Sequence, residues 1–160
     1  MDFFRYSKGE LHCEDVKASR LAEFFGTPLY IYSLKTFIRH FEVIRKAFGN
    51  KPHIICYATK ANSNLAILKT ARLLGGGADV VSGGELRLAL RAGIRPDKIV
   101  FSGVGKTDDE IELALSLKIL FIAAESIQEL ESIARIAKRL KITAPVAVRV
   151  NPDIDPRTHP

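Results

Sequence analysis

The sequence predicts an α/β fold, and within that class a partial (β/α)8 TIM-type barrel with parallel strands. Two observations favour it. Short β-rich runs alternate with longer helical patterns along most of the chain, as parallel βαβ units require. The units also follow one another at a regular spacing without repeating their sequence, which suits a barrel of this type. Because the chain supplies only about five of the eight strands, we expect a barrel truncated at its C-terminal end. An open doubly wound sheet is the alternative.

The first residues differ in pattern from the rest of the chain. Residues 1–34 are predicted to form an N-terminal β segment with a linker helix, and residues 35–160 the incomplete barrel domain. The β segment is expected to be a hairpin that turns at Lys8-Gly9. A short helix is expected from Val16 to Phe25, because a glycine follows it.

Strands and helices of the remaining chain follow from residue type and spacing. Six runs rich in apolar and β-branched residues are predicted to be strands: Leu29–Tyr32, Ile54–Ala58, Ala78–Val81, Ile99–Phe101, Leu120–Ala123 and Val146–Val150. The clearest helix covers about residues 127–140, with one predicted apolar face made of Leu130, Ile133, Ala134, Ala137 and Leu140. Two helices are predicted to begin with capping boxes, Thr107 with Glu110 and Ser126 with Glu129.

Composition excludes several classes of function. The chain is 47% hydrophobic and 26% charged, as in an ordinary globular protein. No apolar run approaches the ~20 residues of a membrane helix, and no secretory signal is present, so we expect a cytoplasmic protein with no membrane partner. The net charge of +6 is scattered, which favours a solvated surface over nucleic-acid binding. The two cysteines and four histidines lack metal-ligand spacing, so no metal is expected.

Three glycine-rich stretches resemble phosphate-binding loops without matching them. Gly103 to Thr107 has the sequence GVGKT, but Val100 stands where a P-loop needs another glycine. The stretch Gly75–Gly77 lacks the third glycine of a dinucleotide-binding fingerprint. Gly83-Gly84 opens a helix after a strand, where backbone amides either hold an anion or simply make a tight turn. The sequence therefore disfavours ATP binding.

Lys60, in the stretch CYATKAN, is the strongest candidate for chemistry. Cys56, Ala58 and Lys60 share one face if the predicted strand stays regular to its end. Barrel enzymes place their chemistry at the C-terminal ends of strands, and a lysine over an apolar wall loses its proton more easily. The neutral amine is the form that makes a Schiff base. An ordinary surface lysine in a βα loop fits the position equally well.

Asp79 and Arg149 are charged residues within otherwise apolar strands. A buried charge is costly unless it is paired. Strand alternation allows both side chains to point into the barrel, and we expect them to lie on one inner side near Lys60, in a single polar network. The alternative is that both are strand-end residues that reach solvent.

These residues lie within recognisable motifs. The stretch YATKAN resembles the cofactor-lysine motif of the alanine-racemase-like (fold-type III) class of pyridoxal-phosphate enzymes. Within that class the chain resembles the diaminopimelate decarboxylase family in four further stretches, which occur in the expected order: Gly26–Ser33, Ala78–Leu86, Lys98–Thr107 and Arg149–Pro152. The tail from Asp153 to Pro160 is similar to a loop of the family, so the resemblance covers essentially the whole chain.

The resemblance implies pyridoxal 5'-phosphate as cofactor and a second, β-rich domain, which the N-terminal β segment would join. Lys60 matches the lysine that holds the cofactor as an internal aldimine, and Asp79 matches an acidic residue near it. Glu85 and Arg149 match polar residues around the same site. The implied reaction converts meso-2,6-diaminopimelate, a small amino-acid substrate, to L-lysine and carbon dioxide in a homodimer.

Other functional groups of the family would lie beyond Pro160, among them the phosphate-binding glycine loop and the histidine stacked on the cofactor ring. We therefore expect these 160 residues to be inactive alone. One alternative is a related decarboxylase of ornithine, arginine or carboxynorspermidine, although Ser82–Glu85 and Gly103–Thr107 favour the diaminopimelate branch. The other alternative is a non-catalytic βα-repeat remnant.

Overall fold

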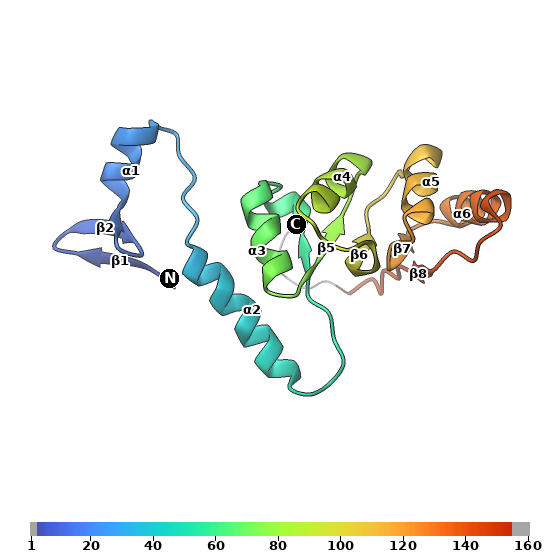
Figure 1. The fold of residues 1–160 in the computed structure, drawn as a ribbon, viewed down its shortest axis with the longest axis horizontal. Helices are drawn as coiled ribbons and strands as arrows, with labels where there is room; N and C mark the ends of the chain where they lie inside the picture. The colour runs from blue at the N-terminus through green and yellow to red at the C-terminus, as the bar shows by residue number, and fades with distance from the viewer. Residues whose placement is uncertain (1–2, 155–160) are drawn as a thin grey trace. The chain divides into compact units, whose positions relative to one another are not determined.

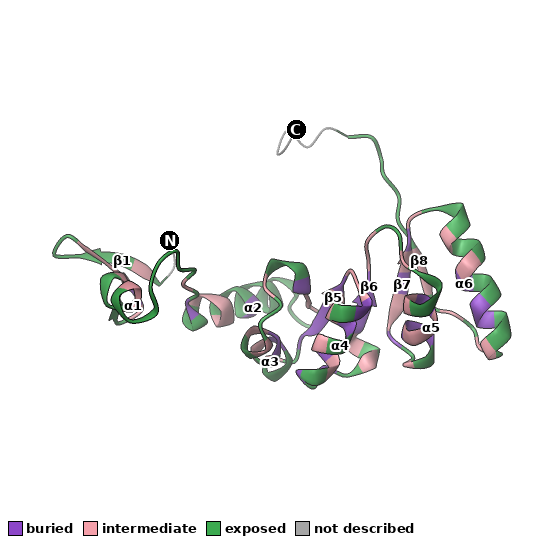
Figure 2. Cartoon of the chain, turned by 90° about the horizontal axis from the view of Figure 1, so that it is seen from above, coloured by how far each residue is buried: buried purple, intermediate pink, exposed green. Residues whose placement is uncertain are grey.

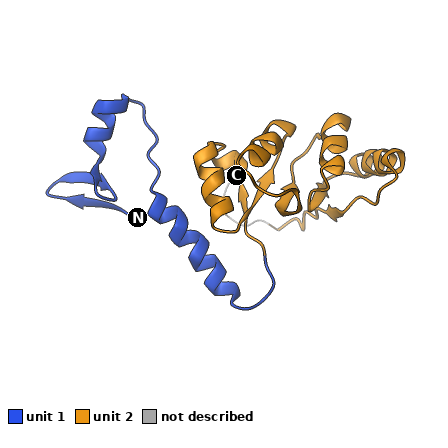
Figure 3. Cartoon of the chain, in the orientation of Figure 1, with its two compact units in different colours: residues 1–53 blue, residues 54–160 orange. Residues whose placement is uncertain are grey.

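A computed structural model describes residues 3–154, and the chain divides into two compact units, residues 1–53 and 54–160 (Figure 3). Each unit has a sheet of its own. Within the described residues, no helix combines the length and the apolarity needed to cross a membrane. The part of the tail beyond residue 154 lies outside the described residues. The predicted domain boundary between residues 34 and 35 stays a prediction.

The N-terminal unit contains an antiparallel sheet of β1 (Phe4–Ser7), β2 (Glu10–Cys13) and β3 (Val16–Lys17), followed by α1 (Ala18–Phe25) and α2 (Leu34–Phe48). The predicted hairpin turn is confirmed, since Lys8 and Gly9 both have positive φ, as a type I′ turn requires. The helix predicted from Val16 begins two residues later, because Val16 and Lys17 pair with β2 instead.

The predicted strand Leu29–Tyr32 is wrong, because this segment pairs with no other described residue and forms no ladder. It leads instead to the start of α2. There the Ser33 hydroxyl accepts the Thr36 amide at 3.0 Å and donates to the Glu14 carboxylate at 2.9 Å. The β2–β3 turn therefore supports the first turn of α2. A run of β-forming residues becomes a strand only when a partner edge is available.

The second unit is a five-stranded parallel sheet whose strands alternate with helices (Figure 1). Its strands are β4 (Cys56–Ala58), β5 (Gly77–Val80), β6 (Ile99–Phe101), β7 (Phe121–Ala124) and β8 (Val146–Val148). Its helices are α3 (Leu65–Leu73), α4 (Gly83–Arg91), α5 (Asp108–Ser116) and α6 (Ile127–Leu140), with short 3-10 turns at Thr59–Ala61 and Pro96–Lys98. The five strands predicted for this part of the chain are confirmed, with ends shifted by one to two residues.

The helices cover one face of this sheet, and the core lies between them and the strands (Figures 1 and 2). Alternate strand residues such as Ala78, Val80 and Phe101 are fully buried against the helices. The opposite face, which would be the interior of a barrel, carries Ala58, Asp79, Val100 and Phe121, which the register aligns across four strands. Ala123, two residues beyond Phe121, lies on the same face and pairs with Ala147 of β8.

The strand order β4-β5-β6-β7-β8 follows the chain without a reversal. An open doubly wound sheet reverses its order at a switch point and carries helices on both faces. Neither feature is present in the described residues, so the partial barrel is confirmed over the open sheet. That the N-terminal segment joins a further β domain stays a prediction.

The last helix differs in detail from the prediction. Ile133, Ile136 and Ala137 face the core, whereas Leu130 and Ala134 are exposed. The capping box of Thr107 and Glu110 is confirmed. The second box forms only in part. The Ser126 hydroxyl accepts the Glu129 amide, but the Glu129 carboxylate accepts the amide of Glu125 instead of that of Ser126.

Candidate functional site

Lys60 lies just beyond the C-terminal end of β4, in the short 3-10 turn Thr59–Ala61. The strand ends at Ala58, so the expected regular alternation up to Lys60 is wrong. Thr59 is fully buried and Lys60 is exposed. The amine of Lys60 makes no hydrogen bond or ion pair with any of residues 3–154. It is therefore available for a reaction or a ligand.

Two asparagines fix the loop after Lys60. The Asn62 side chain accepts the amide of Asn64 at 2.9 Å, and the Asn64 side chain caps α3 by accepting the amide of Ala66 at 2.9 Å. Asparagine is suited to both tasks, because its short carbonyl reaches the backbone two residues ahead. The lysine is thus presented from an ordered turn.

Asp79 lies on the inner face of β5, opposite the buried pair Ala78 and Val80. The register pairs Asp79 with Ala58, two residues before Lys60. Its Oδ1 accepts a hydrogen bond of 2.6 Å from the hydroxyl of Ser102, which directly follows β6. Ser102 was not among the residues singled out from the sequence. Asp79 is therefore a held carboxylate at the end of the sheet where Lys60 also lies.

Cys56 shares this inner face. Its thiol lies 3.8 Å from the Lys98 carbonyl oxygen, to which it donates. Burial first, and then the negative charge of Asp79, raise the pKa of the Cys56 thiol. The thiol therefore stays protonated at neutral pH, which disfavours a nucleophilic role.

Arg149 follows β8 and binds the carboxylate of Glu125 at 3.2 Å. Glu125 comes directly after β7, and its side chain is only 12% exposed. Asp79 and Arg149 therefore have different partners, and the expectation of a single network joining them is corrected. The physical reason is the strand order, since β6 and β7 stand between their strands. Alternation from Ala147 still places Arg149 on the inner side.

Glu85 holds the start of α4. Its carboxylate accepts the amide of Val81 at 2.9 Å, and its own amide donates to the Ser82 hydroxyl. The Glu129 carboxylate in α6 likewise accepts the amide four residues before it. In this structure Glu85 therefore stabilises the backbone between β5 and α4.

Lys106, in the GVGKT stretch, is buried and not arranged as in a P-loop. Its amine donates to the carbonyl oxygens of Gly103 at 2.6 Å and Ala123 at 2.8 Å, and to the Glu129 carboxylate at 2.9 Å. An ammonium group has three protons, and each of them has a partner here. This lysine has no donor left for a phosphate.

The backbone amide of Gly83 also has a hydrogen-bond partner within the protein. It donates to Glu110 at 2.6 Å, and the same carboxylate accepts the amide of Thr107 at 3.0 Å. These backbone hydrogen bonds, that from Gly83 first, lower the pKa of the Glu110 carboxyl group. The anion at this helix start is therefore a carboxylate of the protein itself.

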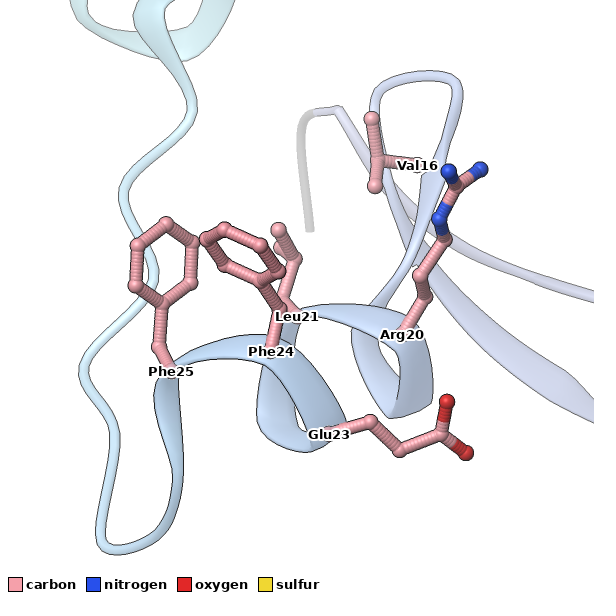
Figure 4. Close-up of a pocket in the computed structure, with 6 residues that line it drawn as sticks. All are labelled: Val16, Arg20, Leu21, Glu23, Phe24 and Phe25. Atoms are coloured by element: carbon pink, nitrogen blue, oxygen red, sulfur yellow. The ribbon is translucent and has the colours of Figure 1, made fainter.

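Two hollows lie along this end of the sheet. One, of about 410 Å³, is lined by Glu125, Arg149, Val150, Asn151 and Pro152. The other, of about 310 Å³, contains Lys106, Glu125 and Glu129 among its lining residues. A third hollow, in the N-terminal unit, is lined by Val16, Arg20, Leu21, Glu23, Phe24 and Phe25 (Figure 4). Its side chains are mainly apolar and offer no nucleophile, so the chemistry is better sought along the sheet.

The chemistry of these groups suits pyridoxal phosphate. A lysine amine that has no partner among the described residues can hold an aldehyde covalently. Asp79 supplies a carboxylate on the neighbouring strand, where it pairs with Ala58, two residues before Lys60. Residues 34–160 match the family described as pyridoxal-dependent decarboxylase, pyridoxal binding domain. The chain belongs to this family. The predicted cofactor, pyridoxal phosphate, and the predicted enzyme class are thereby confirmed at the level of the family.

Similar proteins carry a more specific name. A diaminopimelate decarboxylase of Vibrio cholerae is 50% identical over 100% of this chain and 39% of its own length. The crystal structure of diaminopimelate decarboxylase from Helicobacter pylori complexed with L-lysine has a TM-score of 0.78 and 47% identity, covering 88% of this chain and 36% of that one. The chain thus spans roughly two fifths of the length of such relatives. The recognition of this family from sequence motifs is confirmed.

Proposed function

We propose that this chain is the cofactor-lysine part of a decarboxylase that converts meso-2,6-diaminopimelate to L-lysine and carbon dioxide. The observation that carries the proposal is the identity of about 50% to curated diaminopimelate decarboxylases, sustained over the whole chain. The Lys60 amine, which has no partner among residues 3–154 and lies just beyond the end of a strand, agrees with it. The activity belongs to the complete protein, because this chain covers only part of its relatives.

Each candidate residue has a distinct task in this proposal. Pyridoxal phosphate, when bound, supplies the electron sink for the carbanion left by decarboxylation. Lys60 would hold the cofactor covalently and would transfer a proton at its Nζ. Asp79, oriented by Ser102, would offer a carboxylate at the same end of the sheet. Arg149, oriented by Glu125 at the other edge of the sheet, would offer a guanidinium to the cofactor.

A related decarboxylase with another substrate is the second candidate. A lysine/ornithine decarboxylase of Vibrio vulnificus has a TM-score of 0.70 to this chain but an identity of 23%. At that level the likeness shows the fold alone. The much higher identity to diaminopimelate decarboxylases favours diaminopimelate as substrate. A homodimer and a cytoplasmic location complete the proposal, and they agree with an enzyme of amino-acid biosynthesis.

A non-catalytic βα-repeat remnant is the third candidate. Such a protein has no reason to keep an exposed lysine, a hydrogen-bonded aspartate and an arginine along one end of its sheet. The family match over residues 34–160 also disfavours it. Absorbance of the complete protein after addition of pyridoxal phosphate separates it from an enzyme, since a remnant would show no new band.

Borohydride reduction of the complete protein with bound pyridoxal phosphate tests the assignment of Lys60. Mass spectrometry of its peptides should find the pyridoxyl group on Lys60. A label on Lys69 or Lys106 instead would overturn the assignment. Release of carbon dioxide from meso-diaminopimelate, compared with ornithine and arginine, tests the substrate. Equal or faster release from ornithine would favour the second candidate.

A further inference from the structure

Lys106 and Glu129 form a buried ion pair that joins two neighbouring βα loops. Their side chains are 1% and 8% exposed, and Nζ lies 2.9 Å from Oε1. Nζ also lies 5.6 Å from the centre of the Phe101 ring. Lys106 belongs to the loop between β6 and α5, and Glu129 to the first turn of α6. All three protons of the Lys106 amine have acceptors, and both oxygens of Glu129 accept a hydrogen bond, which offsets the cost of burying such a pair.

The second oxygen of Glu129 fixes the residue that follows β7. Oε2 accepts the amide of Glu125 at 2.8 Å, while the Glu129 amide donates to Ser126. The backbone at Glu125 is therefore bound to the same carboxylate that Lys106 holds. Rotation of the Glu129 side chain would release both contacts at once.

Glu125 in turn orients Arg149. Its side chain is 12% exposed, and its Oε1 binds the guanidinium at 3.2 Å, while the Arg149 side chain is 64% exposed. Both line the hollow of about 410 Å³ at the rim of the sheet. An exposed arginine is thus directed by a carboxylate whose own backbone amide is held by Glu129. One series of contacts thus runs from Lys106 through Glu129 and Glu125 to Arg149.

We propose that Lys106 and Glu129 are a positioning pair, which sets the Glu125 carboxylate and through it the guanidinium of Arg149. The proposal rests on the proposed function in one respect, namely that Arg149 faces the cofactor. Two exposed pairs, Arg135–Asp108 and Arg139–Glu112, already join α5 to α6. A buried pair stabilises no more than apolar side chains of the same volume. What the polar pair adds is the fixed direction of the Glu125 amide.

The test uses the complete protein and measures the dissociation constant of pyridoxal phosphate by fluorescence, with the melting temperature measured beside it. Lys106→Met should weaken cofactor binding by about tenfold, within the usual range of coupled neighbours. In a Glu125→Ala background the same substitution should have no further effect on this constant. Equal weakening in both backgrounds would show that Lys106 does not act through Glu125, and would overturn the proposal.

Two further variants separate position from stability. Arg135→Met removes an ion pair between the same two helices and should leave cofactor affinity unchanged. Lys106→Met combined with Glu129→Leu removes both buried charges. It should recover most of the stability lost in Lys106→Met but keep the weaker cofactor binding, because the Glu125 amide still lacks its acceptor. Recovery of the affinity together with the melting temperature would reduce the pair to a purely structural contact.

Arg149→Met distinguishes failure of this inference from failure of the proposed function. If that variant weakens cofactor binding and Lys106→Met does not, the positioning role alone is wrong. If Arg149→Met has no effect on cofactor affinity, the role of Arg149 in the proposed site is wrong, and the positioning role falls with it. The borohydride label on Lys60 is independent of both results.

Discussion

Lys60 and Lys106 occupy the same kind of place in the fold, each in a connection from a strand to a helix at the C-terminal edge of the parallel sheet. Their amines have opposite surroundings. Lys106 is buried and donates to two carbonyl oxygens and a carboxylate. Lys60 is exposed, and no described residue accepts a hydrogen bond from its amine.

The difference separates a lysine that holds the structure from one that can react. An amine engaged in three short hydrogen bonds cannot approach an aldehyde. An amine that contacts no described residue is accessible to a carbonyl carbon. Of these two lysines, the lysine in the phosphate-loop-like motif is the structural one.

The largest expected effect is on activity at Lys60. Lys60→Ala in the complete protein should lower kcat for decarboxylation by about 10³-fold, as expected when a catalytic proton carrier is removed. Without cofactor, the free energy of unfolding should change by less than about 0.5 kcal/mol, because the side chain is exposed and has no partner among the described residues. Steady-state kinetics and urea unfolding measure the two quantities. Lys69→Ala, on the exposed face of α3, is the control, and a matching loss of kcat there would remove the contrast.

The reverse pattern is expected at Lys106. Lys106→Met should lower the free energy of unfolding of the complete protein by about 3–5 kcal/mol, because it leaves the Glu129 carboxylate buried and unpaired. Arg135→Met, which removes an exposed pair on the same helices, should cost about 1 kcal/mol or less. Urea unfolding followed by circular dichroism provides both values. An equal loss of unfolding free energy in the two variants would mean that water reaches the Lys106–Glu129 pair in solution.

Removal of both charges sharpens this point. Lys106→Met with Glu129→Leu should be less destabilised than Lys106→Met alone, with a residual loss of about 1–3 kcal/mol from the unsatisfied amide of Glu125. The same unfolding experiment measures the difference. A double variant that is less stable than either single variant would show that shape and not charge dominates at this position.

The acid stability of the complete protein should depend on Glu110. Its pKa is lowered by the backbone hydrogen bonds from Gly83 and Thr107. A group with a lowered pKa in the folded state contributes stability above its unfolded pKa, and this contribution is lost as the pH falls through the folded pKa. Glu110→Gln should therefore cost about 1–2 kcal/mol at pH 7 and progressively less below about pH 4. Unfolding free energies between pH 7 and pH 3, with the exposed Glu131→Gln as control, test it. A cost that is independent of pH would contradict this account.

The smallest effect is expected beside Lys60. The Thr59 hydroxyl is fully buried, and no described residue bonds to it. Thr59→Val replaces it by a methyl group and should leave the unfolding free energy unchanged or raise it by up to about 1 kcal/mol. Thr59→Ala should lower it, because it leaves a cavity. If Val proves worse than Ala, a buried water or another group satisfies this hydroxyl.

The sequence predicted the repeating units well, because each rests on local periodicity and local capping. The strands of the second unit, the box at Thr107 and the turn at Lys8-Gly9 are all of this kind. The strand predicted at Leu29–Tyr32 failed because a strand also needs a partner, which a local pattern does not contain. The prediction that Leu130 and Ala134 lie on the buried face was wrong for a related reason. The sequence of a helix shows which residues are apolar but not which of them face neighbouring elements.

Contacts between distant loops could not be predicted in the same way. Lys106 binds Ala123 and Glu129, which lie 17 and 23 residues further along the chain. Ser102 and Glu125 were missed as partners of Asp79 and Arg149 because a serine or glutamate after a strand has many possible roles. One signal in the sequence was available: Ser102 and Glu125 each directly follow a strand, at the end of the sheet where the candidate residues were expected.

Glu110 shows which segments of this partial barrel can be exchanged between related proteins. Its carboxylate belongs to α5 but holds the start of α4 at Gly83, and Glu129 of α6 likewise reaches back to Lys106. These βα units are therefore not interchangeable, because a glutamate of one unit makes a hydrogen bond to the unit before it. A chimaera that takes α5 from a distant relative must take its glutamate as well, or must supply another anion for the amide of Gly83. A crossover at the opposite end of the sheet, between a helix and the next strand, keeps each glutamate with its own helix. It still separates the glutamate from the residue that it contacts in the preceding unit. Preserving both contacts requires the three successive units β5–α4, β6–α5 and β7–α6 to be exchanged together.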